Sequence, residues 1–119
     1  MTINAYQAAR SRAETPRAAE HRLFSQITGE MMDAESAGLT GAQLMNPLHR
    51  NREMWTAFMT DCGAQGNALP AELRASIISL GLWVQRFTSD VMAGRESIGE
   101  LIALNRTVME GLTAQRLAA

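Results

Sequence analysis

The segment that decides the fold is residues 67–94, with the sequence NALPAELRASIISLGLWVQRFTSDVMAG. Pro70 suits the first turn of a helix, and Gly94 follows the last apolar position, where helices commonly end. Between them, apolar residues recur at alternating intervals of four and three: Leu73, Ile77, Leu80, Val84, Phe87 and Val91. This spacing predicts a helix over residues 70–93 with one continuous apolar stripe facing a core.

The opposite side of this helix is also partly apolar. Its positions are Ala71, Ala75, Ile78, Leu82, Gln85 and Ser89, with Trp83 and Arg86 beside them. Two interpretations fit: the helix is buried on two sides of a bundle, or it presents a ridge to a partner helix. Tryptophan and arginine are the residues most often found as binding hot spots. The second interpretation makes Ile78, Leu82, Trp83 and Arg86 candidate protein-binding residues.

Three further helices are predicted, over residues 15–37, 46–62 and 97–116. The first two open with a threonine–proline and an asparagine–proline pair, which are start signals, and each is followed by a glycine. The last opens with Ser97 and Glu100 in the spacing of a capping box. Residues 39–45 can add a turn before the second of these helices.

Strand signals are nearly absent and the predicted loops are short, which makes successive helices antiparallel neighbours. The sequence therefore predicts an all-α fold, a single-domain bundle of four main helices over the whole chain, residues 1–119. Residues 1–14 form an N-terminal arm outside these helices. Tyr6, the only tyrosine, lies in this arm and is a further candidate protein-binding residue that can anchor the arm to the bundle.

Composition excludes several classes of function. The chain has 119 residues, a formal net charge of −1 and no lysine, and its arginines are scattered. Nucleic-acid binding is not expected, because it needs a concentrated basic face. The sequence has no signal peptide and no apolar run near 18 residues. We therefore expect a cytoplasmic location and no membrane association. The single cysteine, Cys62, lies on an apolar stripe and is expected to be a buried thiol.

No residue pattern suggests catalysis. His21 and His49 lack the spacing of metal ligands, and no phosphate-binding loop or nucleophile motif is present. The sequence therefore predicts no catalytic, cofactor-binding or metal-binding residue, no cofactor and no enzymatic activity.

Three polar residues lie on predicted apolar stripes. Asn51 and Asn105 are either boundary positions whose amides reach solvent, or a buried amide pair that fixes the register of two helices. A buried pair fixes the register because a buried amide that loses its partner costs ~1–3 kcal/mol. Glu20 lies beside apolar residues of the first helix and needs an arginine partner if it is buried.

Short motifs along almost the whole chain follow one order and spacing: Asn4-Ala5-Tyr6, Pro16-Arg17, Glu20, Arg22-Leu23-Phe24, Asn51-Arg52 with Trp55, Asp61, Asn67-x-Leu69-Pro70, Leu73-Arg74, Ile77-Ile78-Ser79-Leu80, Trp83-Val84, Asn105 and Met109 to Leu112. In this order the chain resembles FlaF, a small bacterial family of flagellar biosynthesis regulators. The block in residues 67–84 matches best, and residues 34–45 match least.

The resemblance implies a non-enzymatic cytoplasmic protein needed for flagellin production and export. It implies binding to flagellin, in the manner of a secretion chaperone or adaptor, and action opposite FlbT, a regulator that restrains translation of flagellin mRNA. Flagellin termini form amphipathic helices, which a two-sided helix can receive. The alternative is a post-transcriptional regulator that acts on flagellin mRNA or through FlbT. The near-neutral charge and the scattered arginines favour flagellin over RNA as the partner, whereas the sequence does not choose between flagellin and FlbT.

Overall fold

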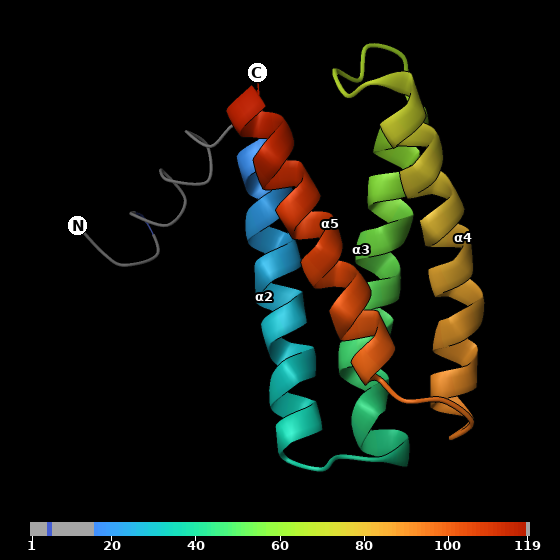
Figure 1. Ribbon diagram of the computed structural model, residues 1–119. Helices are drawn as coiled ribbons and strands as arrows, with labels where there is room; N and C mark the ends of the chain where they lie inside the picture. Colours follow the sequence, from blue (N-terminus) through green and yellow to red (C-terminus); the bar gives the residue numbers. More distant parts are fainter. Residues whose placement is uncertain (1–4, 6–15, 119) are drawn as a thin grey trace.

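The computed structural model describes Ala5 and residues 16–118 (Figure 1). Its long helices are α2 (Pro16–Ser36), α3 (Met45–Gly63), α4 (Ala71–Met92) and α5 (Gly99–Ala118), and a short 3-10 helix, η1 (Gly41–Leu44), precedes α3. These residues contain no strand, so the predicted all-α fold with four main helices is confirmed. The predicted arm over residues 1–14, with Tyr6, lies outside the described residues except for Ala5.

Consecutive helices run antiparallel, as the short loops predict (Figure 1). α2 packs against both α3 and α5, whereas α4 packs mainly against α3. From the end of α4, α5 crosses in front of α3 toward α2, so that α4 and α5 diverge along their length (Figure 1). α4 is therefore an outer helix of the bundle, with α3 as its main neighbour.

Two of the helices end at glycines with a left-handed backbone. At the end of α4, Gly94 has φ 77°, and the N–H of Arg95 donates to the carbonyl of Asp90 at 2.9 Å. At the end of α2, Gly38 has φ 69°, and the N–H of Leu39 donates to the carbonyl of Ala34 at 3.0 Å. Only glycine adopts this conformation without a steric penalty, which explains why both helices end where the sequence predicts.

The predicted start of α3, residue 46, is one residue later than the observed start, and the predicted start of α5, residue 97, is two residues too early. α3 begins at Met45, because η1 leads directly into it, and Pro47 occupies the third helical position. α5 begins at Gly99, not at residue 97. The reason is local: the hydroxyl of Ser97 accepts the N–H of Gly99 at 3.1 Å, so Ser97 precedes the helix and caps it.

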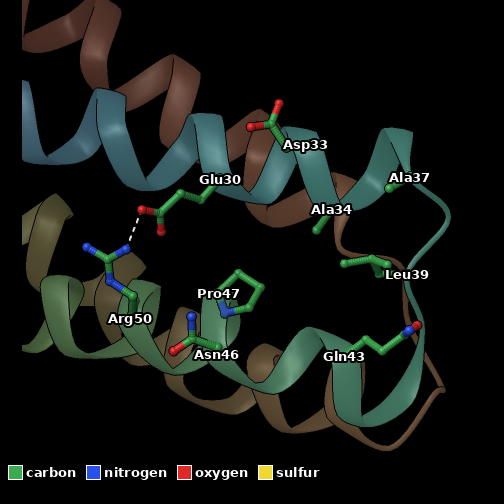
Figure 2. Close-up of a pocket in the computed structure, with 9 residues that line it drawn as sticks. All are labelled: Glu30, Asp33, Ala34, Ala37, Leu39, Gln43, Asn46, Pro47 and Arg50. Carbon is green, nitrogen blue, oxygen red and sulfur yellow. Dashed lines mark hydrogen bonds and ion pairs between the residues drawn. The ribbon is translucent and has the colours of Figure 1, made fainter.

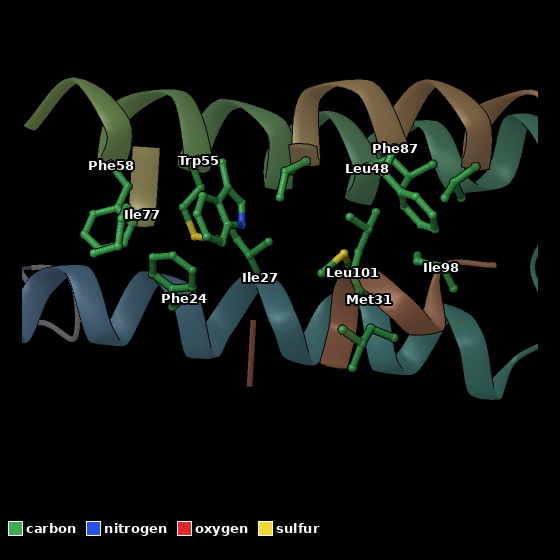
Figure 3. Close-up of a cluster of buried hydrophobic side chains, with 14 of the residues drawn as sticks. Phe24, Ile27, Met31, Leu48, Trp55, Phe58, Ile77, Phe87, Ile98 and Leu101 are labelled. Atoms are coloured by element: carbon green, nitrogen blue, oxygen red, sulfur yellow. The ribbon is translucent and has the colours of Figure 1, made fainter. Parts of the chain in front are cut away.

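The core lies between the inner sides of all four helices (Figure 3). α4 contributes Ile77, Val84, Phe87 and Val91 as buried residues, while Leu73 and Leu80 of the predicted stripe are only half-buried. Phe24 of α2 meets two α3 rings edge-on, with ring centroids 5.5 Å from Trp55 and 5.1 Å from Phe58. Cys62 is buried in this core, as its position predicts.

Candidate partner-binding surface

The outer side of α4 carries an apolar ridge that the bundle leaves uncovered. Leu82 is 55% exposed, the highest value among the exposed large hydrophobic side chains of the described chain. Ile78 precedes it by four residues and is half-buried, and Arg86 follows by four and is exposed. Residues four apart lie on one side of a helix, so these three form a single row. We call Ile78, Leu82, Trp83 and Arg86 the α4 ridge.

Trp83 forms the flank of the ridge nearest the core. Its ring stacks on Phe87, with centroids 4.5 Å apart and planes 20° from parallel. Phe87 is buried, whereas Trp83 is half-buried. One surface of the indole is thus held by the core and the remainder is accessible, which orients the ring without a partner.

Part of the opposite side of α4 contacts α3. The guanidinium of Arg52 on α3 donates to the carbonyl of Gln85 at 2.6 Å and to the hydroxyl of Ser89 at 2.8 Å. The side-chain amide of Gln85 donates in turn to the hydroxyl of Thr56 at 2.9 Å. Gln85 and Ser89 therefore attach α4 to α3. The side of α4 opposite its core stripe thus has two parts: these residues contact α3, whereas the α4 ridge is left uncovered.

A glycine allows this close contact between α3 and α4. Gly81 is buried, and a Cβ at this position would lie 2.2 Å from the sulfur of Met59 on α3. The side chain of Met59 occupies the space that a larger residue would fill. Gly81 follows Leu80 and precedes Leu82, so one turn of α4 combines the contact with α3 and the exposed ridge.

Asn51 and Asn105 lie together in the middle of the bundle, both fully buried. The Asn105 amide donates to the Oδ1 of Asn51 at 2.8 Å and to the hydroxyl of Thr28 at 3.0 Å. The indole N–H of Trp55 donates to the Oδ1 of Asn105 at 2.9 Å. We call Thr28, Asn51, Trp55 and Asn105 the polar centre. It joins α2, α3 and α5. Of the two alternatives given above for Asn51 and Asn105, the structure therefore has the buried amide pair and not the solvent-exposed boundary positions.

Glu20, the third polar residue singled out from the sequence, is half-buried. It lines a small hollow of about 120 Å³ between α2 and α3, together with Leu23, Phe24, Met54, Ala57 and Phe58. This hollow does not include any residue of the α4 ridge.

A larger hollow of about 530 Å³ lies at the other end of the α2–α3 pair (Figure 2). Its lining is mostly small or polar: Glu30, Asp33, Ala34, Ala37, Leu39, Gln43, Asn46, Pro47 and Arg50. Arg50 forms an ion pair with Glu30 across the hollow, so its positive charge is already matched within the protein. Sequence reasoning did not find this hollow, because its walls come from two helices and the turn between them and share no motif.

Two further findings concern metal binding and membrane-spanning helices in the described residues. In the described part of the chain, no group of three or more histidine, cysteine, aspartate or glutamate side chains is placed to hold a metal ion. None of the described helices is both long enough and apolar enough to cross a membrane. What remains as the most distinctive surface is the α4 ridge.

Comparison with known proteins confirms the resemblance seen in the sequence. The family model described as Flagellar protein FlaF matches residues 2–112, which is most of the chain. No curated protein and no solved structure matches. The chain therefore belongs to the FlaF family, a family of flagellar regulatory proteins that is not a known enzyme family, and it has a role in flagellum biogenesis.

Proposed function

We propose that this FlaF-family protein binds flagellin through the α4 ridge and acts as a cytoplasmic chaperone or adaptor for flagellin production and export. The observation that carries the proposal is the exposure of Leu82, at 55%, in the middle of a helix whose other side builds the core. An exposed apolar row flanked by an oriented tryptophan and an arginine is typical of a protein-binding surface.

The ridge suits an amphipathic helix as its partner. Ile78 and Leu82 offer an apolar row of about one helical turn, which matches the one-sided apolar spacing of such a helix. Arg86 is exposed and has no hydrogen-bond or ion-pair partner among the residues that the structure describes. It is therefore available to pair with a carboxylate on the polar side of the bound helix.

Charge disfavours the alternative in which flagellin mRNA is the direct partner. Several arginines are used inside the protein: Arg50 pairs with Glu30, Arg95 with Asp90, and Arg52 binds Gln85 and Ser89. RNA binding needs many free cations on one surface, and the formal net charge of this chain is −1. Regulation through FlbT remains compatible with the same ridge, and the test below separates the three partners.

The test is a quantitative binding assay with the Leu82→Glu variant. Purified wild-type protein and the variant are titrated with flagellin, with FlbT and with flagellin mRNA in three separate series. We expect wild-type protein to bind flagellin, and the variant to bind it at least about tenfold more weakly, because a carboxylate would be desolvated at the contact.

Met32→Glu is the matched control, because Met32 is also an exposed large hydrophobic residue, at 40%, but lies on α2. It should bind flagellin as the wild type does, and both variants should keep the wild-type melting temperature within a few degrees. Equal binding by the Leu82→Glu variant would place the flagellin contact elsewhere. Binding of wild-type protein to FlbT or to mRNA alone would contradict the proposed partner.

A further inference from the structure

The polar centre joins three helices and leaves out the fourth. Its side chains come from α2 (Thr28), α3 (Asn51 and Trp55) and α5 (Asn105), whereas α4 contributes none. Asn105 is the shared member, because its side chain makes three hydrogen bonds within the described residues and each connects α5 to another helix. The attachment of α5 to the bundle is thus polar at its middle and apolar on either side, at Leu101 and Leu112.

One group in the polar centre is unsatisfied. The side-chain nitrogen of Asn51 is buried and has no hydrogen-bond acceptor among the described residues. A buried amide nitrogen without a partner raises the free energy of the closed arrangement. If α5 moves away, water can bind the Asn51 amide, the Asn105 amide, the Thr28 hydroxyl and the Trp55 indole N–H. The hydrogen bonds that opening breaks are therefore replaced by bonds to water, and the two unpaired N–H hydrogens of Asn51 also gain partners.

The connections of α5 allow it to move separately from the α3–α4 pair. α5 is the last helix, and it is joined to α4 by a short loop that contains Gly94 with φ 77°. α4 and α5 diverge (Figure 1), and α4 is held to α3 by Arg52 and Gln85. Moving α5 therefore breaks contacts with α2 and α3 but leaves the α3–α4 contact intact.

We infer that α5 opens from α2 and α3 as a unit while α3 and α4 stay paired, and that the unsatisfied polar centre is the feature that makes this opening accessible. The open state uncovers the apolar sides of α2 and α3 that α5 covers, a groove of the size of one amphipathic helix. This is a conformational device of the free protein, and it does not depend on whether flagellin is the partner.

Amide hydrogen exchange on the full-length free protein, measured over a series of low denaturant concentrations, tests this inference. Amides of residues 103–107, beside the polar centre on α5, should exchange at least about tenfold faster than those of residues 55–59 on α3, with a smaller dependence on denaturant. Equal protection and equal denaturant dependence at the two places would overturn the inference, because α5 would then open only by global unfolding.

The Asn51→Leu variant tests the cause. Leucine has nearly the shape of asparagine and removes the two unpaired N–H hydrogens of Asn51, leaving one unpaired hydrogen on Asn105. Exchange in residues 103–107 should slow by about tenfold, the equivalent of one lost unpaired group. The matched control is Thr88→Val, which removes a buried hydroxyl that bonds only to the Val84 carbonyl of its own helix, α4. It should leave α5 exchange unchanged. Unchanged or faster α5 exchange in Asn51→Leu would overturn the assigned cause.

Discussion

The inner and outer sides of α4 both carry apolar residues at helical spacing, but only the inner side is buried. On the inner side Ile77, Val84 and Val91 are buried in the core, whereas on the outer side Leu82 is 55% exposed. Both sides show regular helical spacing, although the outer row ends in the charged Arg86. Periodicity thus identifies the two sides, but the neighbours of the helix decide which one becomes a core.

The neighbour that decides is α3. It approaches α4 at Gly81, where the side chain of Met59 fills the space beside the backbone, and Arg52 fixes the contact through Gln85. α5 does not cover α4 in the same way, because it crosses toward α2 (Figure 1). Neither helix covers Leu82 on the outer row of α4, so this row is a surface available to a partner and not a second core side.

The largest expected effect breaks the inner side. Ile77 is 2% exposed, and Ile77→Ala removes buried methyl groups and leaves a cavity. We expect a loss of about 2–5 kcal/mol in the free energy of unfolding, measured by urea denaturation. A loss below about 0.5 kcal/mol, which is usual for surface positions, would show that this side of α4 does not carry the core.

A smaller effect is expected from removing a hydroxyl in the polar centre. In the wild type, the Asn105 amide donates to the Thr28 hydroxyl at 3.0 Å. Thr28→Val keeps the shape of the side chain but leaves that amide hydrogen without an acceptor. We expect a loss of about 1–2 kcal/mol in the free energy of unfolding. Thr88→Val on α4 is the control, since its hydroxyl bonds to its own helix. Equal losses for the two variants would mean that the link between helices adds nothing.

Breaking the contact between α3 and α4 at Arg52 should lower the free energy of unfolding somewhat less than Thr28→Val does. Arg52→Ala removes the donors to Gln85 and Ser89, and we expect a loss of about 1 kcal/mol, because the guanidinium is only partly buried. The exposed Arg86 provides the comparison, and Arg86→Ala should change unfolding by less than about 0.5 kcal/mol. Thermal or urea unfolding of the two variants side by side measures the difference.

The helices and their core sides could be predicted because they depend on local patterns. The stripe of α4 and the glycine at the end of that helix lie within a few residues of each other, and both follow from backbone geometry. The first residue of α5 does not follow from the capping-box pattern. Ser97 instead accepts the N–H of Gly99 in a turn that precedes the helix. Such differences of two residues are decided by single hydrogen bonds.

The hydrogen bond between Asn51 and Asn105 could not be predicted from the sequence alone, because it depends on how the helices pack. Each asparagine lies on an apolar stripe, but the two are 54 residues apart in the chain, and nothing local indicates that they meet. The same holds for Arg52, which reaches Ser89 across 37 residues. The exposed fraction of Leu82 also depends on which helices pack against α4, so the sequence offers Leu82 as a candidate without deciding between a core and a surface.

The smallest expected effect is the most informative about the outer side. Leu82→Ala removes the most exposed apolar side chain of α4, and we expect the free energy of unfolding to change by less than about 0.5 kcal/mol. The comparison is with Ile77→Ala on the same helix, where the same truncation removes buried contacts. If Leu82→Ala instead costs as much as Ile77→Ala, then Leu82 is covered in solution and the outer side of α4 is a second core side. A small change, together with weaker flagellin binding by Leu82→Glu, would show that the two apolar sides of one helix serve different purposes: one holds the bundle together, and the other is left for a partner.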